Sequence, residues 1–130
     1  MTTETTTYNV YRVNLEQVRD PNHEGIALVP AQNKYQKAGR FYHVKGVVGL
    51  GMDHDPRPGY NFGDPKENLK GTILQFQFPR AKLAQFEQIA AKHPPPHDPR
   101  ALTEANPDPP VRNCVNWVDD VLAEVKDTLL

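Results

Sequence analysis

The clearest pattern of apolar and polar positions lies near the C-terminus and predicts an amphipathic helix. Apolar residues recur there at helical spacing, while charged residues fall on the other faces. Pro107, Pro109 and Pro110 exclude an earlier start, so Asn113 is predicted to cap the helix and Cys114 to occupy its first turn. The apolar stripe consists of Cys114, Val118, Val121, Leu122 and Val125.

Shorter patterns earlier in the chain predict strands and one further helix. Residues 8–15 and 72–78 mix β-branched and aromatic residues with partial alternation. Residues 25–29 form an apolar run typical of a strand covered on both faces, and residues 40–48 are expected to pair with it as a hairpin. A helix over 79–92 follows the last strand. Strands come first and helices last, so the expected fold class is α+β, with a small antiparallel sheet packed against the C-terminal helix.

The remaining segments are expected to be irregular. Residues 1–7 are polar and threonine-rich and are expected to form a disordered tail. Residues 49–69 contain several glycines and prolines, which indicates a long loop with room for one short strand. Residues 93–110 are predicted to be a proline-rich connecting loop. Residues 8–130 are enough for a single domain that buries about two-thirds of its unfolded surface.

Composition and charge exclude several classes of protein. Fifteen Lys and Arg residues against 16 Asp and Glu give a formal charge of −1. The basic residues are scattered, so we expect no nucleic-acid partner. No apolar run approaches the roughly 18 residues needed to span a bilayer, so no membrane insertion is expected. A single cysteine cannot form an internal disulfide, and the N-terminal residues lack the pattern of a signal peptide. A cytoplasmic location is the resulting expectation.

Neither a metal nor another cofactor is expected. Asp53, His54 and Asp55 offer three potential metal ligands, but adjacent residues rarely converge on one ion, and we interpret them as a solvated turn.

Cys114 is the first candidate for chemistry. At a helix N-terminus, unpaired backbone N–H groups and the helix dipole favour a thiolate over a thiol. A lone cysteine on a buried helical stripe is nevertheless more often a small hydrophobe. Catalysis also needs a base within hydrogen-bond reach and a third group that orients the base. His23 and His43 lie on predicted neighbouring strands, where a hairpin can bring them side by side, although a histidine on a strand is more often structural.

These pieces resemble the circularly permuted branch of the papain-like NlpC/P60 superfamily, whose best-known members are lecithin retinol acyltransferase-like thiol enzymes. That branch carries a His-Trp-Ala-type strand, a second His on the following strand and a late Asn-Cys-Glu-His-Phe helix start. Here His-Glu-Gly-Ile-Ala-Leu stands at 23–28, Phe-Tyr-His-Val at 41–44 and Asn-Cys-Val-Asn-Trp-Val at 113–118. The chain is also similar to small uncharacterised fungal proteins with a Gly-x-x-x-His-Val-x-Gly stretch and a late Cys-x-x-Trp.

The resemblance implies a permuted papain-like architecture with Cys114 as nucleophile, His23 as general base and His43 as the orienting third member. The backbone N–H of Cys114 would help to hold an oxyanion. The sequence departs from the family pattern at Glu24, where the family has an aromatic residue, and at Asn116, where it has a histidine.

The expected function is therefore that of a thiol-dependent hydrolase or acyltransferase acting on an amide or ester of a small molecule or peptide. The alternative keeps the fold without turnover: a small-molecule-binding or cyclisation-assisting accessory protein of a fungal biosynthetic pathway. A structural subunit that recruits a protein partner is a third option. Tyr60, Phe62, Asn116 and Trp117 are the candidate substrate-binding residues, although the aromatic ones suit a core equally well. The prolines at 94–96 offer a contact for a protein partner or a stiff spacer.

Overall fold

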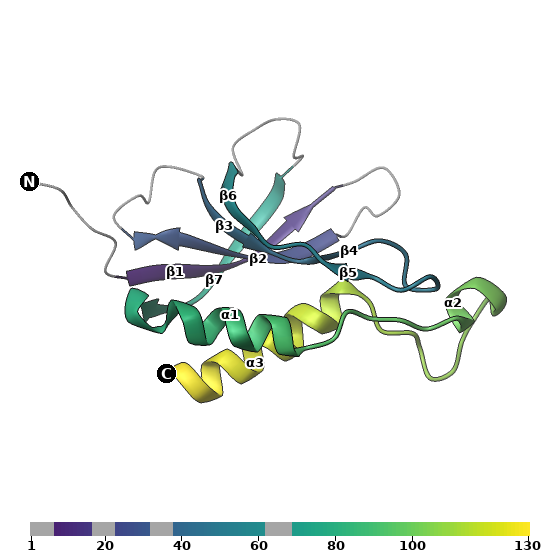
Figure 1. Ribbon diagram of the computed structural model, residues 1–130. Coiled ribbons are helices and arrows are strands. Elements are labelled where there is room, and N and C mark those ends of the chain that lie inside the picture. The colour runs from purple at the N-terminus through teal and green to yellow at the C-terminus, as the bar shows by residue number, and fades with distance from the viewer. Residues whose placement is uncertain (1–6, 17–22, 32–37, 62–68) are drawn as a thin grey trace, which may run out of the picture.

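The computed structural model describes residues 7–16, 23–31, 38–61 and 69–130 and has a mixed α+β fold (Figure 1). Five strands form one antiparallel sheet in the order β6-β3-β2-β1-β7. They are β1 (Thr7–Leu15), β2 (His23–Pro30), β3 (Ala38–Tyr42), β6 (Arg57–Asn61) and β7 (Leu69–Pro79). A separate two-stranded hairpin joins β4 (Val44–Lys45) to β5 (Asp53–His54).

Helices follow the last strand. A short 3-10 turn, η3 (Arg80–Lys82), leads into α1 (Leu83–Lys92), and a single helical turn, α2 (Arg100–Thr103), precedes α3 (Cys114–Leu129). Figure 1 shows α1 and α3 side by side against the sheet, with α2 beyond the β4–β5 hairpin. No helix within the described ranges is long and apolar enough to cross a membrane.

The α+β class and the antiparallel sheet against the C-terminal helix are confirmed. The predicted strand over 40–48 is wrong in one respect. β3 ends at Tyr42, and after His43 the chain leaves the main sheet, because β4 pairs with β5 and not with β2. In the described part of the predicted loop over 49–69, residues 53–54 form β5, residues 57–61 form β6 and Leu69 begins β7. β5 is too short for a periodic signal, and β6 contains a proline and a glycine. β1 begins at Thr7, while the rest of the expected tail lies outside the described residues.

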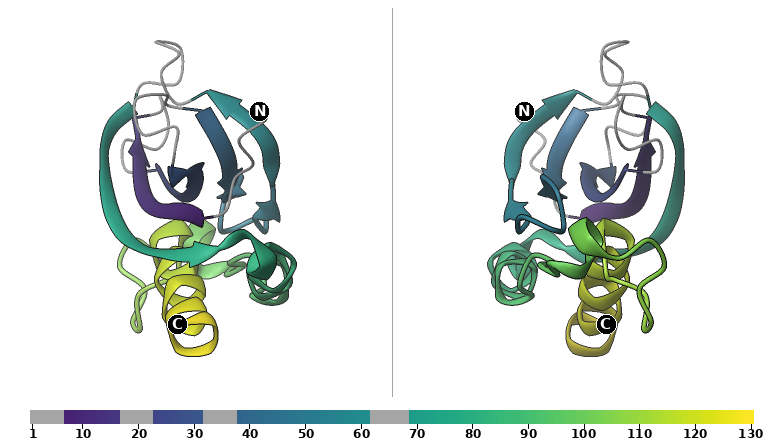
Figure 2. Two further views of the ribbon diagram at one scale, coloured as in Figure 1. Left: turned by 90° about the vertical axis from the view of Figure 1, so that its left-hand side faces the viewer. Right: turned by 90° about the vertical axis from the view of Figure 1, so that its right-hand side faces the viewer.

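Apolar side chains cover both faces of the sheet. On one face they pack against α1 and α3, where both helices direct their apolar stripes at the strands. This helix-facing cluster is formed mainly by Val10, Ile26, Leu28, Phe78, Phe86, Cys114, Trp117, Val118, Val121, Leu122 and Val125. The sheet curls, as Figure 2 shows, and the face turned away from the helices is concave. The concave-face cluster is formed by Val13, Leu15, Ala27, Val29, Phe41 and Tyr60.

The start of α3 is held against the sheet by one arginine. Arg12 on β1 bonds the carboxylate of Glu24 on the neighbouring strand β2. The same guanidinium donates to Asp119 at 2.6 Å and to the backbone carbonyl of Val115 at 3.4 Å. One side chain therefore connects the second residue of β2 with the first turn of α3.

Candidate functional site

His23 and His43 meet at the end of the sheet where β2 begins. Antiparallel pairing sets Ile26 opposite Tyr42, so the residue that follows β3 lies beside the start of β2. His23 Nε2 is 2.6 Å from His43 Nδ1, and the two rings are inclined at 75°. Both side chains are buried, with 2% and 6% of their surface exposed. The two rings therefore form a hydrogen-bonded pair shielded from water.

Gly25 makes room for this pair. A Cβ atom at position 25 would lie 2.4 Å from the ring of Phe41 and 3.0 Å from the Cβ of His43. The Phe41 ring also stacks on the His43 ring, with centroids 4.4 Å apart. Because Gly25 has no side chain, the Phe41 ring can lie over this position of β2. The His43 ring, which stacks on Phe41, can then reach the His23 ring.

Asp55 extends the pair, and sequence reasoning did not select it. Its Oδ2 lies 2.7 Å from His43 Nε2, and its backbone N–H donates to the His43 carbonyl at 2.9 Å. Arg57 donates to the same carboxylate at 2.9 Å, and Lys45 Nζ lies 3.7 Å from Oδ1. The solvated-turn interpretation is wrong: Asp53 is exposed but lies in β5 with His54, whose ring bonds the His93 carbonyl, and Asp55 is bonded to His43. Asp55 reaches His43 through the β4–β5 hairpin, whose register sets position 55 beside position 43 and whose two-residue strands leave no sequence signal.

The surroundings set the charge of each group. Burial lowers the pKa of His43 to about 4; the bond to Asp55 opposes this shift, and the neighbouring His23 adds to it. Burial alone would raise the pKa of Asp55, but hydrogen bonds from Arg57 and His43 outweigh it and hold that pKa below its usual value. At neutral pH, Asp55 is therefore ionised and His43 is a neutral imidazole.

These charges give the hydrogen bonds a direction. An ionised carboxylate only accepts, so His43 Nε2 carries the proton and donates to Asp55. His43 Nδ1 is then an acceptor, and the proton between the rings belongs to His23 Nε2. In its neutral form, His23 consequently presents an unprotonated Nδ1. We call this chain of Asp55, His43 and His23 the histidine relay.

Cys114 is the first residue of α3, as the helical pattern predicts. The Asn113 side chain accepts from the Val115 N–H at 3.0 Å, and the Asn113 N–H donates to Asn116 Oδ1 at 2.9 Å. This capping box fixes the helix start, so the side chain of Asn116 is occupied in capping. The cysteine side chain is 2% exposed and belongs to the helix-facing cluster.

The thiol and the relay belong to neighbouring parts of the molecule. Arg12 joins Glu24, the residue after His23, to the carbonyl of Val115, the residue after Cys114. Cys114 lies in the helix-facing cluster, while the His43 ring stacks on Phe41 of the concave-face cluster.

A pocket of about 240 Å³ lies between the β4–β5 hairpin, α1 and α3. Trp117, three residues after Cys114, lines it together with His43. Tyr60 does not line this pocket; it is buried in the concave-face cluster and stacks on Phe41 with centroids 4.8 Å apart. Phe62 lies outside the described residues. Of the candidate substrate-binding residues, Trp117 is the one that this pocket contains.

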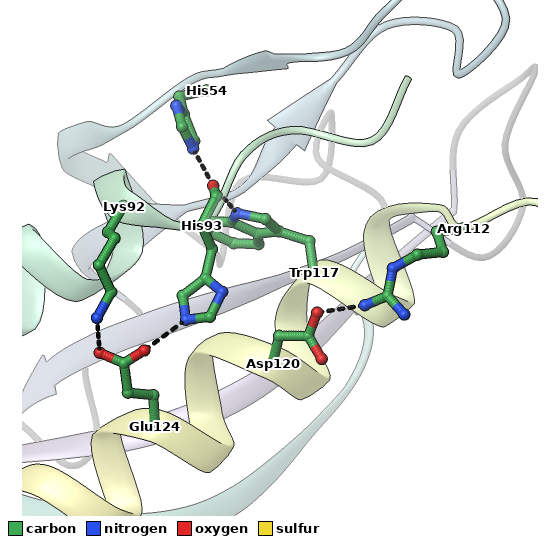
Figure 3. Close-up of polar contacts among 7 residues, drawn as sticks. All are labelled: His54, Lys92, His93, Arg112, Trp117, Asp120 and Glu124. Atoms are coloured by element: carbon green, nitrogen blue, oxygen red, sulfur yellow. Dashed lines mark hydrogen bonds and ion pairs between the residues drawn. The ribbon is translucent and has the colours of Figure 1, made fainter. Parts of the chain in front are cut away.

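The backbone carbonyl of His93 anchors Trp117 (Figure 3). It accepts from Trp117 Nε1 at 3.1 Å and from His54 Nε2 at 2.7 Å. The His93 ring is bonded in turn to Glu124 on α3, with 3.0 Å between Nε2 and Oε1, and Lys92 pairs with the same carboxylate. The end of α1, the β4–β5 hairpin and α3 are thereby joined at one backbone oxygen.

Within the described part of the chain, no three His, Cys, Asp or Glu side chains are grouped so as to hold a metal ion. The relay consists of two hydrogen bonds, in which His23 donates to His43 and His43 donates to Asp55.

Comparison with known proteins gives one result. No curated protein and no solved structure matches the chain significantly. The family described as "Family of unknown function (DUF6540)" matches residues 10–128, which include both histidines, Asp55 and Cys114. The chain therefore belongs to this family.

Proposed function

We propose that the protein is a thiol-dependent hydrolase or acyltransferase that acts on an amide or ester of a small molecule or peptide. Cys114 is its nucleophile, His23 its general base and His43 the residue that orients the base, within a circularly permuted papain-like (NlpC/P60) architecture. The observation that carries the proposal is the directed relay, since a chain from the half-buried Asp55 carboxylate through two buried imidazoles makes His23 Nδ1 the basic ring nitrogen.

The proposed reaction has two steps. His23 Nδ1 takes the thiol proton, and the thiolate attacks the substrate carbonyl carbon to form a C–S bond. Backbone N–H groups of the α3 first turn stabilise the oxyanion, which collapses and expels the alcohol or amine with the proton from His23. Water or a second acceptor then attacks the thioester and gives its proton to His23. The C–S bond breaks, and the departing thiolate recovers the proton.

Two features of the helix start support this role for Cys114. The capping box fixes the first residues of α3, which lie where the positive end of the helix dipole favours a thiolate. The Arg12 bridge keeps this turn beside the start of β2. Burial of the cationic His23 formed in the reaction is offset through His43 by the negative charge of Asp55.

The first test is the rate of alkylation of Cys114 by iodoacetamide as a function of pH. The chain has one cysteine, so the product is unambiguous. We expect a midpoint well below the value of about 8.5 for an ordinary thiol, shifted upward by at least one unit in His23→Ala. A midpoint near 8.5 that His23→Ala leaves unchanged would show that no activated pair exists.

The second test is covalent. Incubation with p-nitrophenyl acetate should add one acetyl group to Cys114, detected by mass spectrometry, together with a burst of p-nitrophenol. Cys114→Ser should lose the burst. Acetylation of lysines alone, with Cys114 unmodified, would contradict the proposal.

A second candidate function is that of a binding or cyclisation-assisting accessory protein, favoured by the pocket that Trp117 lines. This alternative predicts that Cys114→Ser still binds the small molecule and assists its conversion, while Trp117→Ala does not. The acetylation experiment and this pair of variants separate the two functions.

A further inference from the structure

We propose that the pocket beside His43 binds an apolar group the size of two fused aromatic rings, either uncharged or amine-bearing, and discriminates against anions. If the pocket holds the part of a substrate next to the reacting carbonyl, this inference rests on the proposed function. As a binding site, it rests only on the geometry below.

The size of the pocket sets the size of the group. Its volume is about 240 Å³. An engineered cavity of about 150 Å³ in another protein binds benzene, so this pocket has room for a bicyclic ring or an aliphatic group of equal bulk. Aromatic and small apolar side chains dominate its lining, including Trp117, Pro56, Ala90 and Ala91. Such a lining favours an apolar ligand.

The position of the pocket connects it with the histidine relay. His43 lines one wall, and its two ring nitrogens are engaged by His23 and Asp55. Trp117 lines another wall, and residues three apart on a helix share a face, so the pocket continues along α3 from the side that carries Cys114. A ligand in the pocket therefore contacts His43, the proposed orienting residue, and Trp117, which lies one helical turn after the proposed nucleophile.

The polar groups of the lining determine which charges fit. The Tyr42 hydroxyl donates to Glu87 at 2.7 Å, and His54 Nε2 donates to the His93 carbonyl at 2.7 Å. These donors are thus occupied, and so is the N–H of His43. The carboxylate of Glu87 is balanced only loosely by Arg40, at 3.9 Å. The Glu87 carboxylate attracts a cationic ligand and tolerates a neutral one. It repels an anion, which also finds no unoccupied donor among these groups.

Direct binding tests the inference without turnover. The probes are 1-naphthalenemethanol, 1-naphthylmethylamine and 1-naphthoate, which share one ring system. Trp117 is the only tryptophan, so a nitrogen-15 NMR spectrum contains a single indole N–H peak that reports on the pocket. We expect the alcohol and the amine to shift this peak with dissociation constants of about 1 mM or lower. The naphthoate should bind at least about fivefold more weakly.

Matched variants locate the binding. Ala91 is exposed and lines the pocket, so Ala91→Phe should fill it without overpacking the core and weaken binding of the alcohol at least about tenfold. Ala84 is exposed on the same helix and does not line the pocket, so Ala84→Phe should bind as the wild type does. Glu87→Gln should leave binding of the alcohol intact and bring the naphthoate close to it.

Three results would overturn the inference: no shift of the indole peak with any probe, wild-type affinity in Ala91→Phe, or equal affinity for the naphthoate and the alcohol. Failure of the proposed function looks different, because the probes would still bind while Cys114 stays unacylated by p-nitrophenyl acetate. Conversely, acylation of Cys114 without binding of the probes would retain the enzyme and discard this pocket.

Discussion

At the scale of single residues, the carboxylate of Asp55 decides which nitrogen of His23 is basic. It accepts from His43 Nε2, which makes His43 Nδ1 the acceptor for His23. Arg57 helps to keep the carboxylate ionised. The direction of two hydrogen bonds therefore follows from one negative charge at the surface end of the relay.

Asp55→Asn should reverse or weaken this direction. An amide can donate to His43 Nε2, which would put the proton on His43 Nδ1 and remove the acceptor for His23. We expect the alkylation rate of Cys114 at pH 7 to fall by about tenfold or more. Asp53→Asn is the matched control, because Asp53 is exposed in the same hairpin. Equal rates in the two variants would remove Asp55 from the relay.

The sequence allowed the two histidines to be paired, because a hairpin brings positions on neighbouring strands together whatever the details of the loop. Asp55 could not be found in the same way. It reaches His43 through a hairpin with strands of only two residues, where propensity and periodicity carry no information. Tyr60 shows the opposite problem: an aromatic residue in a glycine-rich and proline-rich segment suggested a binding residue, while the curled sheet buries it on Phe41.

Gly25→Ala tests how closely the rings must pack. The new methyl group would overlap Phe41, which is fully buried and has little room to move. We expect a loss of about 1 to 3 kcal/mol in the free energy of unfolding, measured with urea, and slower alkylation of Cys114. Gly71→Ala on β7 is the control, since a Cβ there meets nothing within 4 Å. A neutral effect of Gly25→Ala would mean that the His43 side of the relay tolerates displacement.

At the scale of elements, α3 is fixed at its first turn by its own cap and by Arg12 from β1. The cap could be predicted from the sequence, because Asn113 directly precedes the apolar stripe and prolines block an earlier start. The arginine bridge could not, since it joins residues more than 100 positions apart, and no local pattern shows that β1 lies between β2 and β7.

Arg12→Met should therefore loosen the helix start. It would leave Glu24, whose side chain is 16% exposed, without its cation, and we expect a loss of about 2 kcal/mol in the free energy of unfolding. Arg112→Met removes an exposed pair with Asp120 on the same helix and should cost no more than about 0.5 kcal/mol. Urea denaturation of both variants measures the two losses in the free energy of unfolding. Equal losses would show that the Arg12 bridge does not hold the helix start.

At the scale of the whole molecule, a curled sheet with apolar clusters on both faces encloses a titratable pair at its end. The strand patterns predicted that a sheet would form, but its curl depends on how the strands twist and on the bulges between β1 and β7, which residue periodicity does not specify. This burial lowers the stability of the fold in acid, because His43 stays neutral in the folded protein at pH values well below its ordinary pKa.

Stability should decline as the pH falls from 6.5 toward 4. Above 6.5, His43 is neutral in both the folded and the unfolded chain, and its contribution is constant. Between 6.5 and about 4, the unfolded chain binds a proton at this position that the folded chain does not, so the free energy of unfolding falls by up to about 1.4 kcal/mol per pH unit. Urea denaturation at several pH values should show this slope, reduced in His43→Gln and unchanged in His97→Gln. The same slope in all three proteins would assign the acid sensitivity elsewhere.

The double acceptor at His93 decides how substitutions around it act. Its oxygen belongs to the main chain, so almost any residue at position 93 supplies it, and substitution there leaves the acceptor for Trp117 and His54 in place. The two donors depend on their side chains, because the N–H groups belong to the rings of Trp117 and His54. A substitution at position 93 therefore breaks the contact of the His93 ring with Glu124 and leaves Trp117 and His54 in place, whereas a substitution at position 54 or 117 removes one of the two bonds to the carbonyl.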